Sequence, residues 1–201
     1  YNVDSVTYDD FNETVTDTTF QIKELIESSF IDNEGRTAYR IERYRRNNDT
    51  LPWILEDVWS ANRTTTTAER VEENLRFLKL IFPPKVGKSW KGNAYINAQD
   101  ELAFYDDWDY EYTEVDTSKT IYWYTSDSTR IRNTFLTTLT VLQVDREDLL
   151  EKTYGEEIYA KDVGLVYKKF VHLETQKVSS DPWYKKAEKG FILTMNVVDY
   201  K

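Results

Sequence analysis

Segments rich in valine, isoleucine, threonine, tyrosine and tryptophan recur along most of the chain, and turn-forming residues separate them. These residue types fit a pleated, half-buried surface, so each segment predicts a β-strand. Repeated strands with few helical patterns between them are typical of antiparallel folds. We therefore expect an all-β fold, a single antiparallel sheet that is either curved or closed into a barrel, with little helix. The expected strands are Phe20–Phe30, Thr37–Arg46, Trp53–Ala61, Glu101–Asp116, Lys119–Ser126, Thr134–Val144, Ile158–Thr175 and Phe191–Tyr200.

Three other segments carry weaker patterns. Residues 66–82 begin with apolar side chains at helical spacing, but their second half is apolar on every face, which favours a buried strand. We expect extended structure there, and a single helical turn within residues 181–190. Residues 1–17 are acidic and rich in threonine, so they predict a tether or edge segment in front of a single β domain over residues 18–201.

The charge balance and the absence of cysteine exclude several chemistries. The 201 residues carry a formal net charge of −10. Nucleic-acid binding needs a dense positive surface, and anionic membranes attract basic segments, so the sequence argues against both partners. With no cysteine and one histidine, a disulfide, a thiol nucleophile and a thiolate metal site are excluded. We predict no catalytic residue, no metal and no cofactor, and a binding protein in preference to an enzyme.

The stretch FPPKVGKSWKGNAY, residues 82–95, contains Gly-Lys-Ser at residues 87–89, an order that also ends the phosphate-binding loop of many nucleotide hydrolases. That loop needs a glycine five positions before its second glycine, where this chain has Phe82. The two prolines that follow have no N–H to donate to a phosphate. We therefore expect a turn that leads into a short strand, with Trp90 packed inward, and no nucleotide site.

Acidic and aromatic residues alternate in YDDWDYEY, residues 105–112. On a strand, Trp108 and Tyr110 face one side and the carboxylates face the other. The acidic residues stand at the odd positions that a calcium loop uses, but the glycine of that loop is missing, which favours a solvated acidic face. Trp108 and Tyr110 are candidate ligand-binding residues, because aromatic side chains line most small-molecule sites. The acidic residues are Asp107, Asp109 and Glu111.

Residues 20–46 predict a β-hairpin, because two alternating arms flank turn residues at Asp32–Gly35. A loop of those residues places Glu24 opposite Arg43 on an apolar inner face. Such a pair is either a buried salt bridge that fixes the register or a polar anchor for a ligand in a concave, aromatic-lined face. Glu24 and Arg43 are therefore candidate ligand-binding residues. The apolar residues on their face are Phe20, Ile22, Ile26 and Phe30.

Three stretches together form a recurring pattern: residues 82–95, DNEGRTAYRIERY at residues 32–44, and EEIYAKDVGLVYKKF at residues 156–170. The pattern resembles exported lipoproteins of unknown function from Gram-negative bacteria. The resemblance implies a location in the periplasm or on the cell surface and a lipid anchor on an N-terminal cysteine. This chain has no cysteine, so we expect the anchor, its only membrane contact, to lie outside it. No catalytic residue comes with the family.

These observations lead us to expect one of three classes of function for this chain. The first is a non-enzymatic cell-envelope protein that binds a ligand or a partner protein of the envelope. The second is a carbohydrate-binding or carbohydrate-processing module, which would expose coplanar tryptophan rings. A third is a structural subunit of an envelope assembly, which would expose a large apolar patch.

Overall fold

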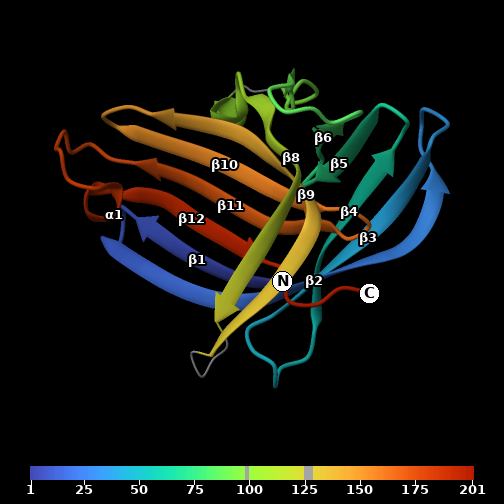
Figure 1. Ribbon diagram of the computed structural model, residues 1–201. Coiled ribbons are helices and arrows are strands. Elements are labelled where there is room, and N and C mark those ends of the chain that lie inside the picture. The colour runs from blue at the N-terminus through green and yellow to red at the C-terminus, as the bar shows by residue number, and fades with distance from the viewer. Residues whose placement is uncertain (98–99, 125–128) are drawn as a thin grey trace. The chain divides into compact units, whose positions relative to one another are not determined.

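The computed structural model describes residues 1–97, 100–124 and 129–201. Within these ranges the chain forms strands that join in one antiparallel sheet, one short α-helix and one 3-10 helix (Figure 1). The elements are β1 Asn2–Asp9, β2 Thr14–Ile31, β3 Thr37–Arg46, β4 Ile54–Arg63, β5 Thr67–Glu72, β6 Leu75–Ile81, β7 Ser89–Lys91, η1 Asp100–Tyr105, β8 Asp109–Tyr124, β9 Arg130–Glu147, β10 Glu151–Ala160, β11 Gly164–Glu174, α1 Trp183–Lys186 and β12 Lys189–Asn196. The 12 strands follow the order β6-β5-β4-β3-β2-β1-β12-β11-β10-β9-β8-β7. The predicted all-β, antiparallel fold with little helix is confirmed.

The chain divides into two compact units. The first unit combines Tyr1–Phe20 with Thr113–Lys201, and the second is Gln21–Tyr112. The two long strands β2 and β8 run from one unit into the other. Each unit has its own buried side chains, and the candidate site lies entirely within the second unit.

The N-terminal segment, predicted as a tether or an edge, contains an internal strand of the sheet. β1 lies between β2 and β12 in the strand order and pairs with β12 along its length. Val3 and Tyr8 of β1 are buried. Threonine and aspartate between the apolar residues obscured this strand, although threonine itself fits a pleated strand well.

Two clusters of buried apolar side chains lie in the first unit. One consists of Ile121, Phe135, Ile158, Ala160, Val166 and Val197. In the other, Tyr8, Val171 and Leu173 are packed by the half-buried Trp183 of α1. The helix α1 is the helical turn that residues 181–190 predict.

The prediction of one strand over Ile158–Thr175 is wrong, because the chain reverses direction within this range. β10 and β11 are two antiparallel strands of one hairpin. At the turn, Asp162 and Gly164 have φ values of 61° and 102°. Aspartate and glycine are the residues that tolerate this left-handed region, so the signal was present but stood inside a long apolar pattern.

The expected strand Glu101–Asp116 is also corrected. Its first part is the 3-10 helix η1, and β8 starts only at Asp109. β8 then continues to Tyr124, so the boundary that we expected before Lys119 is absent. The expected end at Ser126 lies outside the described residues.

Residues 66–82 are extended, as predicted, but they form two strands. β5 and β6 pair as a hairpin whose turn is Glu73-Asn74, with φ values of 49° and 62°. Two consecutive left-handed residues are the mark of a type I′ turn, which matches the twist of its flanking strands. Glycine and asparagine usually occupy such turns, so a glutamate at positive φ is a strained exception.

The β2–β3 hairpin has the predicted pairing at its centre and a different loop. Glu24 is opposite Arg43, as predicted, but Ile31 is opposite Thr37 and not Arg36. The loop is therefore one residue longer than expected, and a bulge at Glu27 restores the register. Asp32 holds the loop, because its Oδ1 accepts the backbone N–H of Arg36 at 2.8 Å.

The stretch 82–95 links the two strands that end the sheet order, β6 and β7. The N–H of Leu78 donates to the carbonyl of Gly92 at 2.8 Å, and the indole Nε1 of Trp90 donates to the carbonyl of Leu78 at 2.8 Å. The phenol of Tyr112 donates to the carbonyl of Ile81 at 2.8 Å and accepts its N–H at 3.0 Å. Trp90 is buried, as predicted. The edge of β6 is therefore shielded by side chains from β7 and β8.

Replacing Gly92 with alanine is expected to lower the free energy of unfolding by about 2 kcal/mol, since an added Cβ overlaps the ring of Tyr110 and that ring is buried. Denaturant melts measure the change. Ser89→Ala, at an exposed position of β7, is the control and should shift the value by less than about 0.5 kcal/mol. If the two variants unfold alike, the Tyr110 ring is not held in place.

Candidate binding site

The predicted pair of Glu24 and Arg43 exists, but a second arginine lies closer to the carboxylate. Oε1 of Glu24 is 3.9 Å from Nη1 of Arg43 and 2.5 Å from Nη2 of Arg70. All three side chains are mostly buried, with exposed fractions of 14 to 15%. Arg70 stands on β5, far along the chain, so the hairpin pattern gave no sign of it.

The same face continues into a charged cluster around one tryptophan. The ring of Trp59 lies 4.3 Å from Cζ of Arg43 and 4.8 Å from Cζ of Arg70. Glu72 lies 3.2 Å from Nε of Arg70 and 3.5 Å from Nζ of Lys79. The carboxylates balance the charges of the arginines stacked on the Trp59 ring. This supports the interpretation of the Glu24 pair as a buried salt bridge and not as an anchor for a ligand. We call this set the arginine–tryptophan cluster; it comprises Glu24, Arg43, Trp59, Arg70, Glu72 and Lys79.

The two aromatic candidates lie in the core of the second unit. Trp108 and Tyr110 are only 3% and 1% exposed. The indole of Trp108 donates to the carbonyl of Phe104 at 2.6 Å, and the phenol of Tyr110 donates to Oδ1 of Asn93 at 3.0 Å. The alternation therefore predicted correctly that Trp108 and Tyr110 face the inside. Rings this deeply packed stabilise the unit and offer no face to a ligand.

The acidic residues on the other side of this stretch bind a lysine. Nζ of Lys91 lies 2.6 Å from Oδ1 of Asp107 and 3.0 Å from Oδ2 of Asp109. These hydrogen bonds raise the pKa of Lys91. Among the residues that the structure describes, no three histidine, cysteine, aspartate or glutamate side chains are arranged to hold a metal ion.

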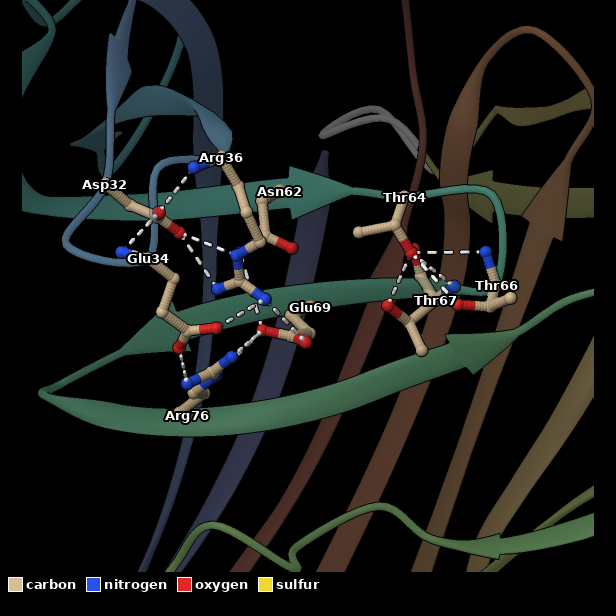
Figure 2. Close-up of polar contacts among 9 residues, drawn as sticks. All are labelled: Asp32, Glu34, Arg36, Asn62, Thr64, Thr66, Thr67, Glu69 and Arg76. Carbon is tan, nitrogen blue, oxygen red and sulfur yellow. Dashed lines mark hydrogen bonds and ion pairs between the residues drawn. The ribbon is translucent and has the colours of Figure 1, made fainter.

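A second charged group fixes the β2–β3 loop to the β5–β6 hairpin (Figure 2). The buried Glu69 accepts hydrogen bonds from Nε of Arg76 at 2.7 Å and Nη1 of Arg36 at 3.3 Å. Arg36 also donates to Asp32, and Arg76 also donates to Glu34 at 2.7 Å. We call these residues the Glu69 network. Every charge in it has an opposite charge beside it, so it is a structural clamp.

One pocket of about 510 Å³ lies beside β4 in the second unit. It forms where β4 extends past the end of β5, since β5 turns at Glu73-Asn74 while β4 continues. Its walls combine apolar side chains with several charged ones. The lining residues are Phe30, Arg40, Glu56, Asp57, Val58, Trp59, Ser60, Val71, Glu73 and Asn74.

The pocket brings together three carboxyl groups that the sequence did not connect. A bulge in β4 leaves Glu56 as the extra residue, because Arg43 pairs with Asp57 while its neighbour Tyr44 pairs with Leu55. Glu73 comes from the strained β5–β6 turn and accepts the indole N–H of Trp59 at 3.1 Å.

The carboxyl groups of Asp57 and Glu73 both line this pocket. Burial raises the pKa of Asp57, the negative charges of Glu73 and Glu56 raise it further, and Arg43 acts in the opposite direction. Negative charges beside a half-buried carboxyl group disfavour its ionised form, which is the case for Asp57. A cation that enters the pocket would remove this repulsion.

Arg40 is the positive residue of the pocket lining, and its charge is already matched. Its Nε lies 3.5 Å from Glu27 and its Nη2 lies 3.2 Å from Glu42. The pocket wall therefore presents an excess of negative charge beside the apolar surfaces of Phe30, Val58 and Val71. This combination suits a ligand that carries both a cationic and an apolar group.

Comparison with protein-family models, with curated proteins and with solved structures returned no match. The site is therefore argued from its own geometry. Neither helical segment in the described ranges has the length and apolar run that a bilayer-crossing helix requires.

Proposed function

We propose that this chain is a non-enzymatic binding protein that takes a cationic segment of a ligand or partner protein into the pocket beside β4. The observation that carries the proposal is that the carboxyl groups of Asp57 and Glu73 line one pocket, where the indole N–H of Trp59 holds Glu73 at 3.1 Å. Their repulsion is relieved when a positive group lies between or beside them. The relief of this repulsion therefore contributes to the free energy with which a cation binds.

The surroundings of the pocket support a partner protein over a small molecule. Phe30 and Val58 share one face of the sheet with Leu25 and Leu55, and each of these side chains is nearly half exposed. This apolar surface extends beyond the pocket itself, and surfaces of this kind mark interaction sites. A segment of a partner protein fills such a surface better than an isolated small cation does.

A carbohydrate-binding module is less well supported. None of the six tryptophans is exposed. Trp90, Trp108 and Trp123 are buried, and the half-buried rings of Trp53 and Trp59 are covered by arginine or lysine side chains. A sugar platform needs free ring faces, so the binding-protein proposal is preferred. The resemblance to exported lipoproteins supports a location in the cell envelope, with an anchor outside this chain.

The double variant Asp57→Asn with Glu73→Gln is expected to weaken binding of a capped peptide of alternating lysine and valine by roughly tenfold. The amides keep the size of the side chains and remove the charges that attract lysine. Isothermal calorimetry at low ionic strength gives the dissociation constants. The affinity of the unmodified protein should also fall as the pH decreases through the raised pKa of Asp57, because the neutral acid does not attract a cation.

The matched control is Asp10→Asn with Glu13→Gln, which removes the same charge from an exposed turn of the first unit. Its dissociation constant should stay within about twofold of the unmodified protein. Equal weakening in both double variants would mean that the peptide follows the overall charge of −10 and not the pocket.

A further inference from the structure

In the described part of the chain, the first half of β4, Ile54–Trp59, pairs with a neighbouring strand on one side only. β3 pairs with β4 from Asn62 down to Ile54. β5 pairs with β4 only over Ser60–Arg63, because β5 ends at Glu72. Within the described ranges, Ile54–Trp59 therefore has a strand neighbour on its β3 side alone. Figure 1 shows β3, β4 and β5 side by side in this unit.

An open strand edge presents backbone N–H and C=O groups that another extended chain can pair with. Proteins usually guard such edges with lysine, proline or covering side chains. The edge of β6 in the same unit is covered in this way by Trp90 and Tyr112. The open part of β4 has the bulge at Glu56 but contains neither lysine nor proline, and its Ile54 is 66% exposed.

The pocket lies along this open edge, because most of its lining consists of consecutive β4 residues and the end of the β5–β6 hairpin. Resting on the proposed function, we infer that the partner binds by strand addition: an extended basic segment of a partner protein pairs with the edge of β4 over Ile54–Trp59. Main-chain hydrogen bonds then supply affinity, and side chains on alternate positions supply specificity.

The two faces of β4 define the sequence pattern of that segment. Asp57 faces the same side as Arg43, and Val58 faces the opposite side with Glu42. Successive side chains of an added strand also alternate between these sides. A segment in which basic and apolar residues alternate therefore brings its cations to Asp57 and Glu73 and its apolar groups to Val58 and Phe30.

A second copy of this chain is a poorer occupant of the edge. Pairing of one β4 with another would bring Glu56 and Asp57 of each copy close to the same carboxylates of the other. Like charges opposite each other in a ladder are destabilising. The overall charge of −10 adds to that repulsion and favours a basic partner.

The test uses the capped lysine–valine hexapeptide in two further forms, one N-methylated at its lysines and the other at its valines. In an added strand, alternate N–H groups point to the edge and the rest point to solvent. One methylated form should therefore lose affinity by roughly tenfold or more, while the other binds within a few-fold of the parent. Calorimetry with the whole chain measures all three.

If both methylated peptides bind like the parent, or both fail, strand addition is overturned while the proposed function stands. If the parent itself does not bind, the proposed function fails first. Amide exchange by NMR provides the second measurement: those amides of residues 54–59 that point to the open side of β4 should become protected when the parent peptide is added. Protection of these amides without peptide, in a chain that sediments as a dimer, would assign the edge to self-association and overturn the inference.

Discussion

Glu24→Ala should lower the free energy of unfolding by about 3 kcal/mol, as expected when one partner of a buried ion pair is removed. Arg43 would lose its only ion pair within the described residues, and its Nε is already buried without a hydrogen-bond partner there. Arg70 would lose its 2.5 Å contact with the carboxylate and keep its 3.2 Å contact with Glu72. Urea melts monitored by tryptophan fluorescence report the loss, because Trp59 stacks on both arginines.

The matched control is Glu27→Ala on the same strand, whose carboxylate is 43% exposed and 3.5 Å from Arg40. An exposed pair of this kind contributes only about 0.5 kcal/mol. The triple change of Glu24, Arg43 and Arg70 to leucine should recover much of the loss, because it removes both arginines together with their carboxylate and Glu72 keeps Lys79 as its partner. If Glu24→Ala unfolds like Glu27→Ala, the pair does not fix the hairpin.

Glu69→Ala should also lower the free energy of unfolding by about 3 kcal/mol. Glu69 is 5% exposed and receives hydrogen bonds from Arg76, Arg36 and Asn62. The arginine side chains are 25 and 27% exposed and keep Asp32 and Glu34 as partners, which limits the loss. Denaturant melts measure it, and circular dichroism checks that the sheet is retained.

Glu69→Gln should cost about half as much, because the amide keeps one acceptor and the side-chain volume. Glu34→Ala is the matched control, since its carboxylate belongs to the same network and is 53% exposed. It should change the free energy of unfolding by about 0.5 kcal/mol. A Glu34→Ala variant that loses as much stability as Glu69→Ala would show that burial is not what makes Glu69 important.

The pairing of Glu24 with Arg43 was predictable because it depends on two adjacent strands and a short turn. It was predicted for a partly wrong reason: the longer loop and the bulge at Glu27 shift the register in opposite directions and cancel. The expected inner face is correct only near one end. Ile22 is 1% exposed, but Ile26 is 66% exposed, and the bulge at Glu27 turns Phe30 to the face opposite Glu24, which is a correction of its predicted side. Alternation predicts which side a residue faces, and the covering elements decide whether that side is buried.

The pocket and Arg70 were not predictable in the same way. Both depend on the β5–β6 hairpin, whose Glu73-Asn74 turn lacks the glycine that usually marks a type I′ turn. Without that turn, residues 66–82 appear as one extended segment, and neither the open edge of β4 nor the placement of Asp57 and Glu73 in one pocket follows. Trp108 and Tyr110 show the reverse case, in which the side was predicted correctly and the depth of burial was not.

The shielding of β6 by Tyr112 makes the two edges of this unit respond differently to acid and base. The phenol replaces a residue of a neighbouring strand, since it both donates to and accepts from Ile81. Burial raises the pKa of Tyr112 to about 12, so the hydroxyl keeps its proton through all but strongly alkaline conditions. The pKa of Asp57 beside the open edge is instead raised by burial and by the charge of Glu73, so this carboxyl group takes up a proton more readily than usual as the pH falls. Acidification therefore alters the charge beside the open edge of β4 and leaves the shielded edge of β6 unchanged.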